Sequence, residues 1–495
     1  MAKCIMVQGT MSGAGKSFLV TALCRIFARK GYRVAPFKSQ NMALNSYITA
    51  DGLEIGRAQA AQAEAAGIAP DVRMNPILLK PNSDTGSQLI VNGTVRGNYP
   101  AREYFAMKPS LVPDILAAYQ SLAAENDIIV IEGAGSPAEI NLRDNDIVNM
   151  GLAELVDAPV LLAGDIDPGG VFAQLYGTMM LLSEQERRRV IGTVINRFRG
   201  DVSLLRPGLA QLESLTGVPV LGVVPYARVE LDDEDSLSSR LRPTDTAGCG
   251  VDVAIIRLPH LSNFTDFAPL ERHPDIGIRY VSKSSQLGFP DLVILPGTKS
   301  TMADLQWIRK QGLEDTIRSL WKQGVLILGV CGGYQMLGQR LSDSEGVEQR
   351  GDMPGMGLLP TETVFSPRKT RMQVEGMCAL SGMEGIPVTG YELHMGTTTC
   401  SPSAHPFCRR RDGTPEGAVT DRVWGTYLHG LFDSAPMVNA LAERLLLAKG
   451  LLPTGQVMED QFAYRQQQYD KMADLVENSL DMERIYREME RFHGK

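Results

Sequence analysis

The sequence predicts an α/β protein with two doubly wound domains, each built on a parallel sheet that helices cover on both faces. Short runs rich in Val, Ile and Leu alternate with longer helical stretches through most of the 495 residues. One segment, residues 228–250, breaks this rhythm with acids, serines, a proline and glycines, which is typical of a linker. The expected organisation is therefore a domain at 1–227, a linker at 228–250 and a domain at 251–495.

In the first domain, the strands are expected at residues 4–8, 33–38, 127–133, 158–164, 190–196 and 218–224. In the second, they are expected at residues 251–257, 276–281, 291–297 and 325–333. Near the end, residues 462–492 carry apolar side chains at three- and four-residue spacing, which predicts helices that pack one face on the body. We assign these helices to the second domain.

Composition limits the classes of function. Hydrophobic residues make up 44% and charged residues 21% of the chain, which is enough to fill sizeable cores and excludes wholesale disorder. A net charge of -8 argues against a general nucleic-acid binder. The seven cysteines form no CxxC pair, and no apolar run approaches the roughly 18 residues of a membrane span. We expect a cytoplasmic protein without nucleic-acid or membrane partners.

A glycine-rich loop follows the first strand and leads into a helix. Its backbone N–H groups and the helix N-terminus suit phosphate oxygens, the lysine suits the β/γ-phosphates, and the serine hydroxyl suits Mg²⁺. The strict phosphate-binding motif has a glycine six residues before the lysine, where this chain has Thr10, so the motif is a variant. The alternative explanation is a glycine-rich turn that merely connects the strand to the helix. The residues expected to bind ATP or GTP are Gly9, Thr10, Ser12, Gly13, Ala14, Gly15, Lys16 and Ser17.

Other polar residues lie at strand ends, where ligands of parallel sheets collect. Glu132, Asp165 and Asp167 are candidate Mg²⁺ ligands, and an ordinary turn or helix cap is an equal alternative for each. Lys38 is a candidate second cation for a transferring phosphoryl group, or an exposed lysine at a strand end. Asn196 has the donor and acceptor to read an adenine, although a turn-forming asparagine is the commoner explanation.

A cysteine follows the strand of the second domain that ends at residue 330. Cys331 stands before two glycines at a strand-to-helix turn, a geometry that exposes a nucleophile at a helix N-terminus. A nucleophilic thiolate needs a base, and His429 between glycine-containing turns is the better candidate, with His394 second. Residues 296–300 and Gly332 are expected to supply backbone donors for an oxyanion.

The motifs QGTMSGAGKS, FKSQNMALNS, EIGRAQAAQAEAAG, LPGTKST, GVCGGYQMLG and GTYLHGLF resemble those of the cobyric acid synthase family. In that family, a dethiobiotin-synthetase-like P-loop ATPase domain precedes a class I glutamine amidotransferase domain. The resemblance implies that Cys331 is the nucleophile of a glutaminase and His429 its base. It also implies ATP and Mg²⁺ at the glycine loop, with Glu132 and Asp51 as further Mg²⁺ ligands and Asn196 near the adenine.

By the same resemblance, the substrates are glutamine, ATP and a corrinoid. The expected reaction is glutamine-hydrolysing amidation of the b, d, e and g carboxylates of adenosylcobyrinic acid a,c-diamide, which gives adenosylcobyric acid in cobalamin biosynthesis. The alternatives are a cobyrinic acid a,c-diamide synthase, another glutamine-dependent amide ligase, and a partition-type ATPase with a dead amidotransferase domain. Amidotransferases usually carry a glutamate two residues after the histidine, where this chain has Leu431.

Overall fold

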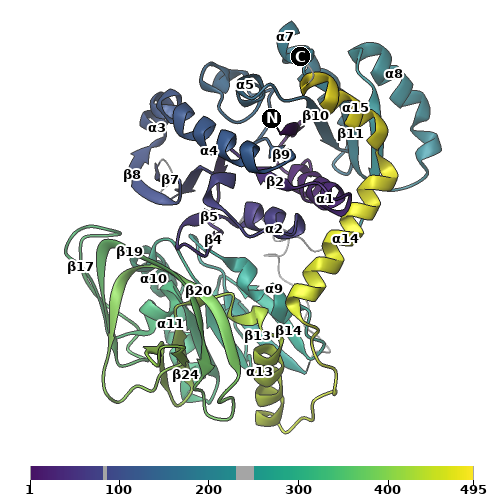
Figure 1. The fold of residues 1–495 in the computed structure, drawn as a ribbon. Helices are drawn as coiled ribbons and strands as arrows, with labels where there is room; N and C mark the ends of the chain where they lie inside the picture. Colours follow the sequence, from purple (N-terminus) through teal and green to yellow (C-terminus); the bar gives the residue numbers. More distant parts are fainter. Residues whose placement is uncertain (1, 82–85, 230–249, 494–495) are drawn as a thin grey trace. The chain divides into compact units, whose positions relative to one another are not determined.

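The computed structural model describes residues 2–81, 86–229 and 250–493 and divides the chain into two compact units (Figure 1). The first unit combines Met1–Ala43, Leu53–Asp232 and Arg465–Lys495, and the second combines Leu44–Gly52 with Asp233–Tyr464. Most of the predicted linker at 228–250 lies outside the described residues. Each unit therefore contains a piece of chain that is remote in sequence from the rest of that unit.

A parallel sheet forms the centre of the first unit, with strand order β12-β11-β10-β1-β9-β2. Its strands are β1 (Lys3–Gly9), β2 (Val34–Phe37), β9 (Ile128–Glu132), β10 (Val160–Asp165), β11 (Val190–Phe198) and β12 (Val220–Pro225). All of them coincide with predicted apolar runs, because residues buried on both faces of a parallel sheet read as continuous Val, Ile and Leu. The parallel pairing brings the ends of β1 and β9 together, with Val7 opposite Glu132.

A second, smaller sheet in this unit was not predicted, and its strand order is β3-β6-β7-β8. Its strands are β3 (Gln40–Met42), β6 (Ile77–Pro81), β7 (Gly86–Val91) and β8 (Thr94–Pro100). A further short strand, β5, is Glu54–Gly56. The helices are α1 (Lys16–Arg29), α2 (Arg57–Ala65), α3 (Ala101–Met107), α4 (Val112–Glu125), α5 (Met150–Leu155), α6 (Val171–Leu181), α7 (Glu184–Arg187) and α8 (Arg206–Thr216).

The last two helices, α14 (Gln461–Ser479) and α15 (Met482–His493), are yellow in Figure 1. From Tyr469 onward, their buried side chains join the core formed by β1, α1 and the neighbouring strands, and Ile485 and Met489 are fully buried there. Arg25 of α1 also forms an ion pair with Asp470, at 2.8 Å. This differs from the expectation that the terminal helices belong to the second domain, since their apolar stripe faces the first unit's sheet.

The second unit has its own parallel sheet, with order β14-β13-β15-β16-β24-β23 and only the edge strand β23 antiparallel. The strands are β13 (Val251–Ile256), β14 (Ile276–Val281), β15 (Leu292–Leu295), β16 (Leu326–Val330), β23 (Ala418–Thr420) and β24 (Val423–Thr426). The helices are α9 (Ala268–Glu271), α10 (Thr301–Lys310), α11 (Leu313–Lys322), α12 (Gly332–Leu337) and α13 (Ala435–Ala448). The four strands predicted for this half are confirmed.

A mixed sheet, which was not predicted, extends the second unit along the path β18-β17-β19-β20-β25. Its strands are β17 (Arg340–Asp343), β18 (Gly351–Pro354), β19 (Thr361–Cys378), β20 (Pro387–Cys400), β21 (Cys408–Arg410), β22 (Pro415–Glu416) and β25 (Leu428–His429), and β4 is Ser46–Ile48. The half-polar alternation of β19 and β20 made these strands harder to recognise than the fully buried ones.

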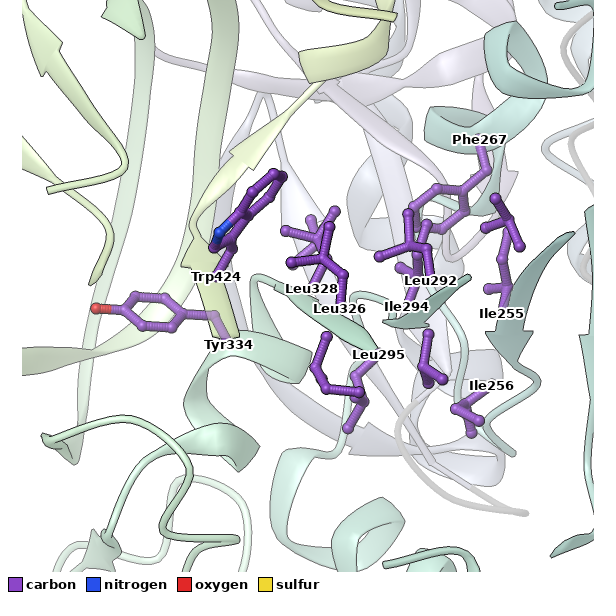
Figure 2. Packing of buried hydrophobic residues seen from close by; sticks show 14 of the residues in the cluster. Ile255, Ile256, Phe267, Leu292, Ile294, Leu295, Leu326, Leu328, Tyr334 and Trp424 are labelled. Carbon is purple, nitrogen blue, oxygen red and sulfur yellow. The ribbon is translucent and has the colours of Figure 1, made fainter. Parts of the chain in front are cut away.

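The core of the second unit holds the elements that carry the site. Figure 2 shows Phe267 beside Ile255 and Leu292, and Trp424 beside Leu328. Phe267 is 1% exposed and ends the short 3₁₀ turn η6 (Phe264–Phe267). Its burial fixes this turn on the sheet. In the described residues, no helix is long and apolar enough to cross a membrane.

Candidate active sites

The glycine loop of the first unit joins β1 to α1 as predicted. Gly13 and Gly15 adopt left-handed backbone angles, with φ of 77° and 92°. A Cβ on Gly15 would lie 1.9 Å from Nδ2 of Asn196, so this position excludes other residues by both conformation and space. The loop ends at the N-terminus of the 14-residue helix α1, where backbone N–H groups favour phosphate.

Lys16 is held inside the loop. Its Nζ donates to the carbonyl oxygens of Met11 and Gly135, each at 3.0 Å, and the residue is 7% exposed. The ammonium group thus lies between the glycine loop and the segment after β9. This position fits the predicted contact with a nucleotide's β/γ-phosphates.

Glu132 forms the centre of a buried polar cluster at the end of β9. Its Oε1 accepts hydrogen bonds from Ser17 Oγ at 3.0 Å and Lys38 Nζ at 2.9 Å, and Gln62 Nε2 donates to Oε2. Burial alone would raise the pKa of Glu132, but the charges of Lys38 and Lys16 and the hydrogen bonds hold that pKa below its usual range. The carboxylate is therefore ionised at neutral pH.

The cluster suits Mg²⁺ chemically, because hard cations take carboxylate and hydroxyl oxygens. Ser17 and Glu132 bring one oxygen of each kind together at the start of α1. Asp165 and Asp167 are engaged elsewhere in the same unit: Asp165 pairs with Arg197 at 2.8 Å, and Asp167 pairs with Arg199 at 3.2 Å. Within the first unit, Ser17 and Glu132 are thus the predicted ligands that the structure brings together.

Asp51 belongs to the second unit, in the segment Leu44–Gly52, where Thr49 Oγ1 donates to its carboxylate. Its role as a Mg²⁺ ligand stays a prediction. Asn196 is 3% exposed and donates from Nδ2 to the carbonyl oxygen of Ala14 at 3.1 Å. Its amide supports the glycine loop, and a contact with adenine likewise stays a prediction.

In the second unit, Cys331 follows β16 and is the N-cap residue of α12. Its backbone has φ of 52° and ψ of -109°, a strained conformation for a residue with a side chain. The following glycines allow the turn to pack closely: a Cβ on Gly333 would lie 2.0 Å from the carbonyl oxygen of Leu295, and one on Gly332 would lie 3.2 Å from the amide nitrogen of Thr298. The elbow therefore adjoins the loop predicted to supply oxyanion donors.

His429, on β25, lies next to this elbow. Its charge interacts with that of Cys331, which helps to raise the pKa of the imidazole, and it is 1% exposed. The Cys331 thiol also contacts the carbonyl oxygen of Leu393, at 3.5 Å. The structure thus brings together the two residues predicted as nucleophile and base.

Asp266 is the partner of His429 that the sequence analysis missed. Its Oδ2 lies 2.6 Å from His429 Nδ1, and its Oδ1 accepts the backbone N–H of Gly430 at 3.1 Å. Burial would lower the pKa of His429, but Asp266 and Cys331 outweigh it and raise that pKa to about 10. Asp266 is 163 positions from His429 in the chain, and nothing in the sequence NFTDFAPL marks it.

His394, the second candidate base, is engaged differently. Its Nδ1 lies 3.1 Å from the carbonyl oxygen of Gly396 and its Nε2 lies 3.4 Å from Glu392, while its ring stacks on Tyr427 with centroids 3.6 Å apart. Both ring nitrogens therefore have partners other than the thiol. The geometry favours His429.

One unit has a parallel sheet with a phosphate-binding loop, and the other has a Cys–His–Asp arrangement. Together they define an ATP-using enzyme with a glutamine amidotransferase domain. Family models agree: residues 5–237 match the CobQ/CobB/MinD/ParA nucleotide binding domain, and residues 252–437 match the CobB/CobQ-like glutamine amidotransferase domain.

Full-length relatives identify the family. The chain is 53% identical to a cobyric acid synthase of Ruminiclostridium cellulolyticum, covering 99% of this chain and 98% of that protein. It is 52% identical to one of Yersinia enterocolitica, covering 98% of each. The chain belongs to the cobyric acid synthase family.

Proposed function

We propose that this protein amidates the b, d, e and g carboxylates of adenosylcobyrinic acid a,c-diamide, with glutamine as nitrogen donor and ATP as energy source. The product is adenosylcobyric acid, an intermediate of cobalamin biosynthesis. The observation that carries this proposal is the identity of about half of all positions to cobyric acid synthases over nearly the entire chain. The two sites described above supply the chemistry that such a reaction needs.

In the second unit, the Cys331 thiolate attacks the side-chain amide carbon of glutamine. His429, protonated because its pKa is raised, donates a proton to the nitrogen as the C–N bond breaks and ammonia leaves. Neutral His429 then takes a proton from water, whose oxygen attacks the thioester. Glutamate leaves and the thiolate is restored. Asp266 keeps the proton of Nδ1 in place, so that Nε2 exchanges protons with the reacting atoms.

In the first unit, a substrate carboxylate attacks the γ-phosphorus of ATP, and ADP leaves. The acyl phosphate that results is attacked by ammonia, and inorganic phosphate leaves as the amide forms. Lys16 and Lys38 place positive charge where the transferring phosphoryl group gains negative charge. Mg²⁺ bound by Ser17, Glu132 and phosphate oxygens would add charge neutralisation.

The direct test uses purified protein with ATP, Mg²⁺, glutamine and adenosylcobyrinic acid a,c-diamide, followed by mass spectrometry of the corrinoid. Four successive exchanges of acid for amide are expected. An unchanged corrinoid would refute the substrate assignment. Conversion of cobyrinic acid at positions a and c would instead support the sister enzyme, the a,c-diamide synthase.

The division of labour between the units is tested with Cys331→Ala. This variant should lose glutamine-dependent synthesis and retain ammonium-dependent synthesis within about twofold, since the thiol acts only in releasing ammonia. Loss of both activities would show that the two sites are not separable. Retention of glutamine-dependent synthesis would exclude Cys331 as the nucleophile. A partition-type ATPase with a dead amidotransferase domain is disfavoured because the Cys331–His429–Asp266 arrangement is intact.

A further inference from the structure

We infer that Tyr391 is a positioning residue of the glutaminase and that the segment Leu44–Gly52, here called the inserted segment, sets its position. The N-terminal half of the chain thereby completes the amidotransferase site. This inference rests on the proposed role of His429 as the base for Cys331. It concerns Tyr391, to which the sequence analysis assigned no role.

The inserted segment packs into the second unit along β19 and β20. Ile48 is fully buried and forms a small cluster with Tyr391 and Leu393, which are 3% and 7% exposed. The carbonyl oxygen of Ile48 also accepts a hydrogen bond from the side chain of Gln373 on β19. Tyr47 contacts the Tyr391 ring edge-on, with centroids 5.3 Å apart. The segment thus covers the strand that carries Tyr391.

Three hydrogen bonds form a closed ring between this segment and the site. Tyr391 Oη donates to the carbonyl oxygen of Ser46 at 2.8 Å, and Asn263 Nδ2 donates to Tyr391 Oη at 3.1 Å. The backbone N–H of Ser46 donates to Asn263 Oδ1 at 3.2 Å. All three residues are at most 3% exposed, so water does not readily replace a lost partner.

Both supports of His429 depend on this ring of hydrogen bonds. The Tyr391 ring stacks on the His429 ring, with centroids 5.4 Å apart and planes inclined by 29°, and the two residues are directly paired between β20 and β25. Asn263 is the N-cap of η6, the turn that carries Asp266. Ser46 is therefore hydrogen-bonded both to Tyr391, which stacks on the imidazole of His429, and to Asn263, which caps the turn that carries Asp266.

The inserted segment is also linked by sequence to the nucleotide site. Ser46 is the last residue of FKSQNMALNS, and Lys38, the second residue, forms the buried ion pair with Glu132. Only residues 39–45 separate the two. One short stretch of chain thus supplies a cation to the ATP-binding unit and a hydrogen-bonded anchor to the glutaminase.

The test is Tyr391→Phe in the full-length protein, which keeps the stacked ring and removes the hydroxyl that joins Ser46 and Asn263. We expect kcat for glutamine hydrolysis to fall about tenfold with KM changed less than about twofold, because a slightly misplaced base impairs the reaction more than substrate binding. Ammonium-dependent synthesis should stay within about twofold. Tyr391→Leu, which also removes the stacking, should cost more than Tyr391→Phe.

A second readout needs no substrate. The rate at which iodoacetamide alkylates Cys331 is measured as a function of pH. In Tyr391→Phe, the ratio of the rate at pH 7 to the rate at pH 10 should fall severalfold. The reason is that a displaced imidazolium pairs less well with the thiolate. Asp266, Cys331 and Tyr391 are the titratable groups against His429 in the described residues. The control is Tyr280→Phe on the edge strand β14, which should match wild type.

The outcomes separate the two proposals. A wild-type protein without glutaminase activity would refute the proposed function. A wild type that hydrolyses glutamine, together with a Tyr391→Phe variant of unchanged kcat and unchanged alkylation profile, would overturn the inference alone. Equal losses in Tyr391→Phe and Tyr280→Phe would also overturn it, because the effect would then reflect removal of any buried hydroxyl.

Discussion

At the scale of single residues, the second unit orients its base with a carboxylate from an unexpected place. The position two residues after His429 holds Leu431, and the carboxylate comes instead from Asp266, before β14 in the chain. Phe267 anchors that turn in the core beside Ile255 (Figure 2). Asp266 thus orients His429 in place of the usual glutamate, from a different loop. This agrees with the view that such catalytic sites are defined by geometry rather than by sequence position.

Asp266→Asn tests this role. The neutral amide stabilises the charged imidazole less than a carboxylate does, so kcat for glutamine hydrolysis should fall about 100-fold while ammonium-dependent synthesis is retained. Asp412→Asn, in an exposed turn of the same unit, is the matched control. Normal glutaminase activity of Asp266→Asn would show that Cys331 and His429 work without the carboxylate.

The same variant has a pH-dependent effect on stability. The pKa of His429 is about 10 in the folded protein and about 6.5 when unfolded, so its protonation stabilises the fold fully below about pH 6.5, and this contribution is lost as pH rises through about 10. The thermal midpoint of the second unit should therefore differ most between wild type and Asp266→Asn near pH 6, and the difference should shrink toward pH 10. A difference that is constant or grows with pH would contradict the sign.

At the scale of elements, the strands that were predicted and those that were missed differ in burial. The parallel strands such as β9 and β16 are buried along their whole length, and their apolar runs made them recognisable. β19 and β20 alternate between buried and exposed residues and contain charged positions, so their pattern is weaker. The sequence motifs located Lys16, Glu132, Cys331 and His429 because each follows or precedes a turn at a strand end.

The residues that were missed act across long distances in sequence. Asp266 and Tyr391 meet His429 only through the folded sheet, and Gln62 reaches Glu132 from helix α2. No local pattern of charge or spacing distinguishes these positions from ordinary polar residues. Their discovery required the pairing of strands, which a single sequence does not specify.

The glycine loop provides a prediction at this scale. Gly15→Ala places a Cβ 1.9 Å from Asn196 Nδ2 in a backbone conformation that disfavours side chains, so ATP affinity should fall at least about tenfold. Gly177→Ala in α6 is the matched control in the same unit, because a Cβ there has no neighbour within 4 Å. The control should bind ATP normally and gain about 0.5–1 kcal/mol in stability. Equal ATP affinity in the two variants would show that the loop does not enclose the nucleotide.

At the scale of the whole molecule, neither unit is a continuous piece of chain. The second unit takes Leu44–Gly52 from within the sequence of the first, and the first takes its terminal helices from beyond the second. Because each unit is completed by a remote segment, the nucleotide-binding fold is finished only when the C-terminus has been made. We therefore predict that substitutions in the C-terminal helices impair the reaction of the first unit. Glutamine hydrolysis should be spared, although the amidotransferase sequence immediately precedes these helices in the chain.

Ile485→Ala in α15 tests this prediction. Ile485 is fully buried in the core of the first unit, and its truncation leaves a cavity that should cost about 2–5 kcal/mol. The thermal transition of the first unit and ammonium-dependent synthesis at elevated temperature should therefore decline, while glutamine hydrolysis persists because Cys331 and His429 belong to the other unit. Leu452→Ala, at a side chain that is 86% exposed, should leave both activities unchanged. Loss of glutaminase activity before loss of synthesis in Ile485→Ala would instead assign the terminal helix to the stability of the second unit.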